Sequence, residues 1–443
     1  MSSPGAVTPP VVRGRAADPA ARRRVAAWAL WDCGATGVNA IVMTFGFNVY
    51  LTSVVGKDLP GQTTPESWLG RAVFVAGLSV AVLAPVTGVL VDAAHRRRGA
   101  LAILTGLVVL LTASMTFIRP DYHYLWAGLA LLAAAAACMD LATVPYNAML
   151  RQLSTPGTSG RVSGFGLAAG FFGSVVVLLL VYVGFKAGTG DTVGLLGIPN
   201  TDGKPDRYAV LVAAAWFAVF ALPLLLSVRS PAHDGTSTVG FFGAYRKLWT
   251  EVVSEWHRDR NVVYYLIASA VFRDGLTGIS LFGPVLGVSV YGLTPASVPL
   301  FGACAFTIAA LGAVAGGLLD DRVGSKPVIV TSLAAMVAVG VTLMFLSGTV
   351  AFWVCGLLLC LFVGPTQSAA RNLMLRISAE GKEGVAFGLF TTTGRAAHTL
   401  SPWLFSLFID IFATSRAGMG GLCTVLALGL VGMTLVRVPA PRS

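Results

Sequence analysis

The stretch Ala270-Val-Phe-Arg-Asp-Gly-Leu-Thr-Gly278 places two adjacent charges inside a long apolar run. An earlier stretch, Ala29-Leu-Trp-Asp-Cys-Gly-Ala-Thr-Gly37, repeats the pattern with Ala, Gly, Thr and Gly in register. The alignment sets Asp32 opposite Arg273, so one apolar segment has been used twice with a different charge at the same position. A charge at mid-bilayer costs about 2.5 to 3.5 kcal/mol on insertion scales. Charges kept at that cost predict a pathway for a solute or an ion.

The composition indicates an integral membrane protein. Of the 443 residues, 55% are hydrophobic and only 12% are charged, and the mean hydropathy is +0.77, far above that of soluble domains. A helix needs ~20 apolar residues to cross the hydrocarbon of a bilayer. The apolar runs and short polar breaks predict an all-α membrane protein with twelve transmembrane helices, embedded in the lipid bilayer.

Cysteines and charges exclude several classes of protein. The six cysteines lie in apolar runs without metal-ligand or Cys-x-x-Cys spacing, so we expect neither disulfides nor a metal site.

Most of the 31 Lys and Arg residues fall in segments on the side of the N-terminus, which places both termini in the cytoplasm. This topology explains the net charge of +11 without a nucleic-acid partner. The first twenty residues contain no apolar run, so we expect no cleavable signal peptide. A chain rich in Ala and Arg with few Lys points to a bacterial plasma membrane.

The chain divides into two halves joined by a charged linker. We expect a disordered basic tail (1–24), an N-terminal six-helix half (25–228), a cytoplasmic linker (229–260), a C-terminal six-helix half (261–437) and a short tail (438–443). An apolar stripe in the linker predicts an amphipathic helix on the inner leaflet, formed by Phe241, Tyr245, Leu248, Trp249, Val252 and Trp256. The twelve expected helices cover residues 25–50, 67–91, 99–118, 124–150, 162–185, 208–228, 262–291, 295–319, 327–346, 349–375, 385–412 and 418–436.

Three further pairs of motifs recur in the same order in both halves, which indicates a parallel tandem repeat of six plus six helices. In one of them, Gly317 to Asp321 matches Gly88 to Asp92, and the second copy continues as Gly317-Leu-Leu-Asp-Asp-Arg-Val-Gly-Ser-Lys326. Glycine lets two helices approach, and aspartate caps or bridges a helix end, so breaking such contacts would let the halves rock. The expected gating residues are Gly88, Asp92, Arg96, Arg97, Gly317, Asp321, Arg322, Gly324 and Lys326. Ordinary positive-inside charge is the alternative reading of these loops.

Polar side chains share one face in several expected helices. Asp32, Thr36 and Asn39 are spaced i, i+4, i+7, and Asp140 and Asn147 share a stripe of the fourth helix. These faces should look into the bundle and bind a solute or protons, because a buried carboxylate can take up and release a proton during a transport cycle.

The second half adds basic residues to this set. Arg273 and Asp274 point about 100° apart on a helix, with Thr277 one turn further on, so at least one of the pair must reach another helix or a solute. Arg395 and His398 lie in mid-helix, where an arginine fork could hold a carboxylate or phosphate and a histidine could relay protons. Gln367 completes the set as a hydrogen-bonding candidate.

Each of these residues also has a purely structural alternative. Asp32 could be locked in an ion pair with Arg273 or Arg395, and Asp140 could be the partner of Arg151 or Arg161. The amides could tie helices together rather than bind a solute.

The glycine- and aspartate-containing loop signature resembles the one that the major facilitator superfamily carries between its second and third helices and repeats between its eighth and ninth. A larger set of motifs resembles the vacuole-effluxer branch, which includes the autophagy-related vacuolar amino-acid exporter. These motifs are Trp28-Ala-Leu-Trp-Asp32, Phe272-Arg-Asp-Gly275, Gly364-Pro-Thr-Gln-Ser-Ala-Ala-Arg371, Phe387-Gly-Leu389 with Gly394-Arg395, and Ser415-Arg-Ala-Gly418. In this family the first helix usually reads closer to Tyr-Asp-Trp-Ala-Asn, whereas this chain has Trp31-Asp-Cys-Gly-Ala35. The resemblance implies solute transport, with amino-acid efflux in the eukaryotic branch.

The sequence thus predicts a monomeric secondary transporter with two six-helix halves and a central cavity. Its mixed charges suit a zwitterionic or anionic metabolite, first of all an amino acid, with protons as the coupling ion. Efflux of a drug or secondary metabolite, or a non-transporting receptor or scaffold, is the alternative. No nucleotide motif and no convergent nucleophile and base occur, so we expect neither ATP-driven transport, nor an enzyme, nor a cofactor.

Overall fold

The computed structural model describes residues 19–60, 64–187, 192–199, 201, 203–227, 243, 246, 260–294 and 297–437. The expected amphipathic helix of the linker therefore lies outside the described residues, apart from Gly243 and Arg246, and so does the short tail after residue 437.

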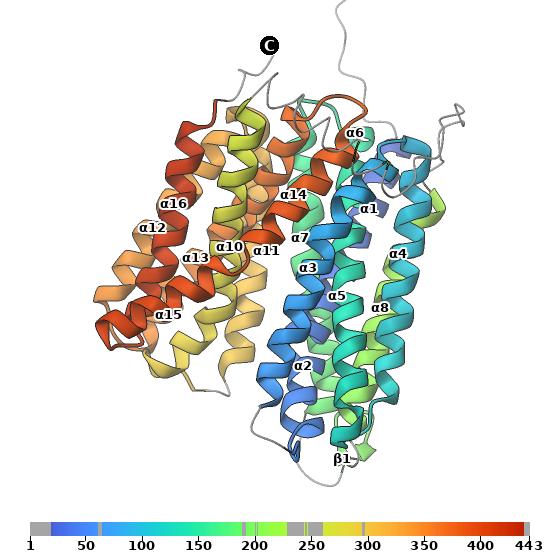
Figure 1. Ribbon diagram of the computed structural model, residues 1–443, viewed down its shortest axis with the longest axis vertical. Coiled ribbons are helices and arrows are strands. Elements are labelled where there is room, and N and C mark those ends of the chain that lie inside the picture. The colour runs from blue at the N-terminus through green and yellow to red at the C-terminus, as the bar shows by residue number, and fades with distance from the viewer. Residues whose placement is uncertain are drawn as a thin grey trace, which may run out of the picture.

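The described chain is almost entirely helical and forms two bundles that lie side by side (Figure 1). The long helices of the N-terminal half are α1 (Pro19–Val38), α3 (Pro65–Val91), α4 (Ala94–Ser114), α5 (Leu125–Ala148), α7 (Ser159–Val181) and α8 (Lys204–Ser227). Its short elements are η1 (Asn39–Phe45), α2 (Phe47–Tyr50), η2 (Leu51–Val55), η3 (Met115–Phe117), η4 (Tyr122–Tyr124), α6 (Leu150–Leu153) and η5 (Tyr182–Lys186), with an antiparallel hairpin of β1 (Thr192–Val193) and β2 (Ile198–Pro199).

The C-terminal half repeats this arrangement. Its helices are α10 (Arg260–Ser289), α11 (Val298–Val323), α12 (Ser325–Phe345), α13 (Thr349–Ile377), α14 (Glu383–Ala397), α15 (Leu400–Phe412) and α16 (Ala417–Leu435). We call the end of the bundle at which α1 begins and α16 ends the terminal end, and the opposite end the distal end.

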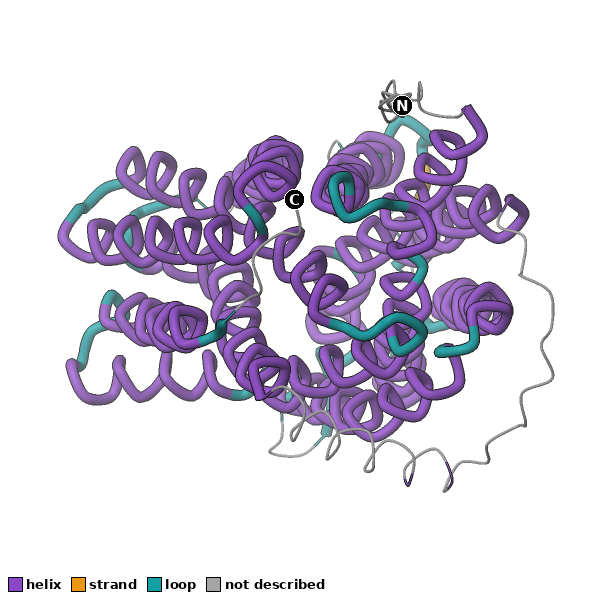
Figure 2. Tube along the Cα trace, turned by 90° about the horizontal axis from the view of Figure 1, so that it is seen from above, coloured by secondary structure: helices purple, strands orange, loops and turns teal. Residues whose placement is uncertain are grey.

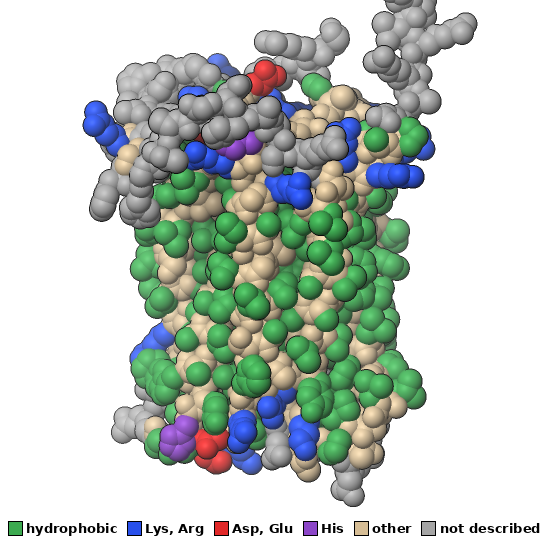
Figure 3. Space-filling model, turned by 90° about the vertical axis from the view of Figure 1, so that its right-hand side faces the viewer, with side chains coloured by type: hydrophobic (Ala, Val, Ile, Leu, Met, Phe, Trp, Pro, Cys, Tyr) green, Lys and Arg blue, Asp and Glu red, His purple; other side chains and the backbone are tan. Residues whose placement is uncertain are grey.

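The surface fits a bilayer. Apolar side chains form a belt around the middle of the molecule, and charged side chains gather at its two ends (Figure 3). Within the described residues, eleven helical segments are long and apolar enough to cross a membrane. The twelfth crossing consists of α14 and α15, which are separated by a break. This is the twelve-helix architecture predicted from the sequence.

The first crossing is longer than expected. It begins at Pro19 rather than near residue 25, so the last part of the expected tail is helical. It continues through the π-helical turns η1 and η2 to Val55. The second crossing begins as its sequence dictates, with Pro65 at the first helical position and the Thr64 hydroxyl accepting a hydrogen bond from the Ser67 N–H at 3.4 Å.

The eleventh crossing was expected as one helix from 385 to 412, and the structure divides it at His398 and Thr399. Pro402 has no N–H to donate to the carbonyl group four residues earlier, at His398. The N–H of Ser401, which would bond to Ala397 in a continuous helix, donates to the Asp274 carboxylate at 2.6 Å. Pro402 and the hydrogen bond from Ser401 to Asp274 thus interrupt the helix together.

The two halves meet where α3 packs against α14 and α7 packs against α11. Figure 2 shows the helices of the molecule from above. Glycine makes both contacts close, because a Cβ on Gly88 would collide with the carbonyl oxygen of Gly384, and one on Gly317 would lie 2.6 Å from that of Gly160. Both contacts lie near the terminal end.

Candidate functional site: charge networks between the two halves

The start of α14 is held against the N-terminal half by two carboxylates. Asp92, directly after α3, accepts a hydrogen bond from the Val385 N–H at 3.0 Å. Glu383, whose side chain is 3% exposed, forms ion pairs with Arg97 at 2.8 Å and with Arg151 at 2.6 Å. The first turn of a helix has unpaired N–H groups and partial positive charge, so Asp92 serves as a cap donated by the opposite half. We call this network the α14 latch.

The two arginines of the α14 latch are themselves fixed by backbone carbonyls. Arg97 donates to Val91 and to Ala148, each at 2.9 Å. Arg151 reaches across to the C-terminal half and donates to the carbonyl of Ser378 at 2.8 Å. The guanidinium groups are therefore rigidly oriented toward Glu383.

The repeat places a second latch at the start of α7. Asp321, in the last turn of α11, accepts from the N–H groups of Gly160 at 2.8 Å and Arg161 at 3.0 Å. Its carboxylate also pairs with the Arg161 side chain at 2.9 Å. The neighbouring Asp320 pairs with Arg376 at 3.1 Å. This α7 latch mirrors the α14 latch, since each half caps one helix of the other.

The remaining gating candidates lie near these latches. Gly324 has φ +91° at the turn between α11 and α12, a conformation that favours glycine. Lys326 donates to the carbonyl of Val436 at 2.5 Å and so holds the end of α16 within its own half. Arg96 is half-buried, and Arg322 is exposed.

Deeper in the bundle, Asp32 of α1 pairs with Arg371 of α13 at 3.4 Å. The two side chains are 13% and 10% exposed. Arg371 also donates to the Ser163 hydroxyl at 3.0 Å, and its guanidinium lies 4.9 Å from the centre of the Trp28 ring. The Thr36 hydroxyl donates to Asp32 at 3.5 Å. This pair links the two halves at membrane depth.

A second pair, Asp140 of α5 with Arg395 of α14, also links the halves. Both side chains are partly exposed. The sequence offered Arg151 or Arg161 as partners of Asp140, but both of these arginines lie in the latches at the terminal end. Their helical spacing from Asp140 does not bring them to its carboxylate.

Arg273 and Asp274 each reach another helix, as their divergence on α10 predicts. Arg273 donates to the Phe390 carbonyl at 2.7 Å and lies 3.8 Å from the centre of the Phe390 ring. Asp274 accepts from the Ser401 N–H, and the Thr277 hydroxyl returns to the Arg273 carbonyl at 3.0 Å.

Asp32, Arg273 and Arg395 therefore make separate contacts and do not form one cluster. Arg273 is nevertheless close enough to Asp140 and Arg395 to interact electrostatically with both. The other candidates lie on several elements: Asn39 is exposed at the start of η1, Asn147 and Gln367 are half-buried on α5 and α13, and His398 lies in the break.

Several charged residues of these networks were not among the sequence-based candidates, and Arg371 and Glu383 are the most important of them. Arg371 stands in the motif 364–371, near the end of an expected helix, where arginines ordinarily extend toward the headgroups. Glu383 precedes an expected helix and resembles an ordinary loop charge. For Arg371 the family motif was the available signal, whereas Glu383 lies in none of the motifs, and only the fold shows that both are buried.

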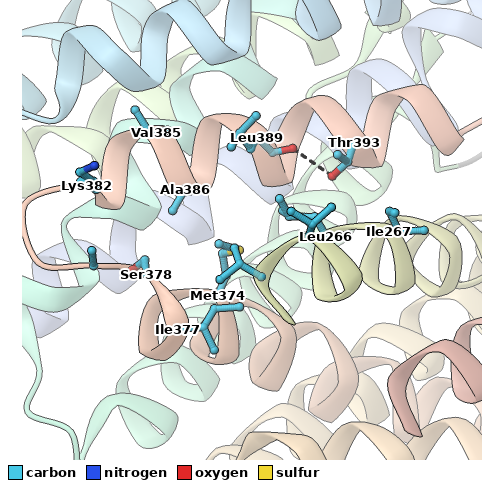
Figure 4. A pocket seen from close by; sticks show the side chains of 13 residues that line it. Leu266, Ile267, Met374, Ile377, Ser378, Lys382, Val385, Ala386, Leu389 and Thr393 are labelled. Atoms are coloured by element: carbon cyan, nitrogen blue, oxygen red, sulfur yellow. Dashed lines mark hydrogen bonds between the residues drawn. The ribbon is translucent and has the colours of Figure 1, made fainter. Parts of the chain in front are cut away.

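An apolar cavity of about 200 Å³ lies inside the C-terminal half, between α10, α13 and α14 (Figure 4). Leu266, Met374 and Leu389 line it, with Lys382 at one side. Its lining contains none of the four residues of the membrane-depth ion pairs, so it is distinct from the charged network.

A family model described as Major Facilitator Superfamily matches residues 38–402. The chain belongs to this superfamily. Its members are transporters, so this chain is a transporter and not an enzyme. The expectation from the loop signature and the repeat is confirmed.

Curated relatives of this superfamily member include two fungal proteins named Autophagy-related protein 22. The Yarrowia lipolytica protein is 23% identical over 282 residues, which cover 57% of this chain and 46% of the relative. The Cryptococcus neoformans protein is 24% identical over 312 residues, covering 64% and 52%. The chain spans about half the length of the curated relatives it matches. They confirm the predicted resemblance to the vacuole-effluxer branch.

Solved structures confirm the major facilitator fold. The transporter FucP in the outward conformation superposes with a TM-score of 0.69 at 13% identity, over 95% of this chain and 99% of that one. The proton:xylose symporter XylE gives a TM-score of 0.67 at 15% identity, over 94% and 95%.

Proposed function

We propose that the protein exports a small zwitterionic or anionic metabolite, first of all an amino acid, by alternating access coupled to protons. The observation that carries this proposal is the presence of two ion pairs, Asp32 with Arg371 and Asp140 with Arg395, that join the two halves at membrane depth. A static bundle has no need of such pairs, because replacing a buried ion pair by apolar residues is often neutral or stabilising.

The pairs can act as switches because rocking of one half against the other must separate their members. A separated carboxylate or guanidinium at this depth leaves an uncompensated charge, which costs about 3 to 5 kcal/mol. A proton on Asp32 or Asp140, or a solute that takes the place of one partner, removes that cost. Separation of the halves is then tied to binding.

The chemistry of the four groups favours an amino acid as the solute. A guanidinium fork binds a carboxylate through two parallel hydrogen bonds, and a protein carboxylate accepts from an ammonium group. An amino acid offers both groups within one small molecule. The Autophagy-related protein 22 relatives and the vacuole-effluxer resemblance support the same choice.

The latches support an orientation and a direction. If the terminal end, rich in Arg and Lys, faces the cytoplasm of a bacterial cell, both latches close the cytoplasmic side. The described state is then the one that releases solute outward. We expect the protein to work as a monomer, with the whole pathway inside one chain.

The test is transport by the purified protein in liposomes across a panel of amino acids, with and without a pH gradient. We expect Asp32→Asn to reduce proton-driven flux at least about tenfold, equivalent to about 1.4 kcal/mol. The matched control Asp58→Asn, in an exposed loop, should retain wild-type flux. Flux that does not depend on the pH gradient would refute proton coupling. Absence of amino-acid flux would refute the proposed class of solute.

One observation favours the alternative of an amphiphilic drug or secondary metabolite. Phe171 of α7 stacks on Phe306 of α11, with ring centres 5.9 Å apart across the two halves. Aromatic surface between the halves would suit a flat apolar solute. Transport of amphiphilic dyes, reduced by Phe306→Ala and unaffected by Asp32→Asn, would support this alternative. Wild-type function after neutralisation of both ion pairs would indicate a receptor or scaffold.

A further inference from the structure

The junction between α14 and α15 combines two features that are unusual inside a membrane. The first is a helix end, where backbone carbonyls lose their helical donors. Pro402 offers no N–H to the His398 carbonyl, and the Ser401 N–H is directed to Asp274. Figure 1 shows α14 between the two halves and α15 continuing away into the C-terminal half.

The second feature is a pair of buried oxygen atoms that make no well-aligned hydrogen bond. Asp274 is 3% exposed and Ser401 is 0% exposed. Within the described part of the chain, Asp274 Oδ1 and Ser401 Oγ make no well-aligned hydrogen bond, although the Ser401 hydroxyl lies close enough to the Asp274 carboxylate to interact with it. A buried polar atom without a good hydrogen bond has lost its hydration without full compensation, so such atoms point to a ligand.

The Asp274 carboxylate is held by the Ser401 N–H in the first turn of α15, and within the described ranges it has no cationic side chain as an ion-pair partner. Arg273 is directed to the carbonyl and ring of Phe390, and Arg395 is paired with Asp140. Among the described residues no Lys or Arg forms an ion pair with Asp274. His398, in the break itself, is a titratable group that interacts electrostatically with Asp274.

We propose that this junction binds a sodium ion. Asp274 Oδ1, Ser401 Oγ and carbonyls at the end of α14 supply oxygen ligands, which hard cations prefer. The carboxyl-terminal end of α14 carries partial negative charge and adds to the attraction. Interrupted helices whose free carbonyls and helix ends hold an ion are an established way to bind Na⁺ inside a membrane.

The site deepens the proposed function by adding a second coupling ion, and its position explains how the ion would act. The ion would join α10 to the junction of the crossing whose first turn carries the α14 latch. Occupancy would therefore stiffen this crossing between its two segments. The site involves neither membrane-depth ion pair, so it can be tested separately from proton coupling and from the identity of the solute.

The test is equilibrium binding of ²²Na⁺ to the purified full-length protein in nanodiscs, without any solute. The variants are Asp274→Asn, Ser401→Ala and the matched control Ser280→Ala, whose hydroxyl on α10 returns to the carbonyl of Leu276. We expect saturable binding by the wild type and the control, a roughly tenfold weaker affinity for Ser401→Ala, and loss of binding for Asp274→Asn. Ser401→Ala keeps the N–H that Asp274 accepts, so it should fold even if Asp274→Asn does not.

Several outcomes would overturn the proposal. The wild type could show no saturable sodium binding, or Ser401→Ala and Asp274→Asn could bind sodium as the wild type does. Proton uptake abolished by Asp274→Asn, with no sodium binding, would make Asp274 a proton carrier instead. A failure of amino-acid transport in liposomes would refute the proposed function but would leave this measurement unaffected.

Discussion

Replacement of Glu383 by glutamine should open the terminal end. Glu383 is the carboxylate at which both arginines of the α14 latch converge, at 2.8 Å from Arg97 and 2.6 Å from Arg151. Glutamine has nearly the same shape but no charge, so the change removes two ion pairs and leaves the helix intact. Because both arginines belong to the N-terminal half, the loss falls only on the state in which the halves are joined at this end.

The burial of the pair sets the size of the effect. Removing one partner of a buried ion pair costs about 3 to 5 kcal/mol. Part of that cost is recovered here, because the backbone carbonyls that hold Arg97 remain and glutamine can still accept a hydrogen bond. A net loss of about 3 kcal/mol shifts the equilibrium toward the open state roughly 150-fold, at 1.36 kcal/mol per factor of ten.

Spin labels can report this shift as a distance. Labels at Thr155 and Val323, two exposed positions at the terminal ends of opposite halves, would be placed in a background without the native cysteines. The matched control is Glu380→Gln. Glu380 lies 4.0 Å from the same Arg151, but its side chain is 92% exposed, so its loss should change the equilibrium by less than about 1 kcal/mol.

The expected result is a longer label distance in Glu383→Gln and an unchanged one in Glu380→Gln. If both variants gave the wild-type label distance while remaining folded, the prediction that Glu383 keeps the terminal end closed would be refuted. If both shifted equally, net charge rather than the buried contact would control the closure.

Three further changes test separate parts of the network. Asp140→Arg or Arg395→Asp alone should reduce transport at least about tenfold. The double exchange should restore part of the transport, since opposite charges would face each other again. An equal loss of transport in all three variants would contradict a pairing role. Gly88→Ala should increase the label distance at the terminal end, because its Cβ meets the Gly384 carbonyl, while Gly99→Ala, with open space around it, should not. Lys326→Ala should lower the free energy of unfolding by about 1 kcal/mol without changing the label distance, because the contacts of Lys326 lie within one half. A changed label distance would show that Lys326 is a gating residue.

The fold could be predicted because it depends on features that repeat along the chain. Apolar runs report crossings directly, since an unpaired backbone is too costly in lipid. The duplicated motifs report the two halves. The break at His398 is different, because proline alone is tolerated within membrane helices. It needed the Asp274 carboxylate to capture the Ser401 N–H, a contact between residues 127 positions apart.

The sequence could predict which residues belong to the candidate site, but not which of them form ion pairs with each other. Helical spacing shows which residues share a face, and it correctly grouped Asp32 with Thr36, whose hydroxyl donates to it. It cannot show which helix of the other half that face meets. Asp32 meets Arg371, 339 residues away, and not Arg273, although the repeat aligns Arg273 with Asp32. Equivalent positions in a duplicated fold occupy equivalent places in different halves, so alignment does not imply contact.

The eleventh crossing connects these observations. The first turn of α14 carries the latch, Arg395 near its end pairs with Asp140, and the junction that follows is held by Asp274. The first two contacts are made to the N-terminal half and the last to the C-terminal half. When the halves separate, α14 must release the first two while the junction stays with α10. A continuous helix would transmit that motion rigidly to its distal end, whereas a broken one can bend. The break therefore allows the terminal end to open without displacing α15.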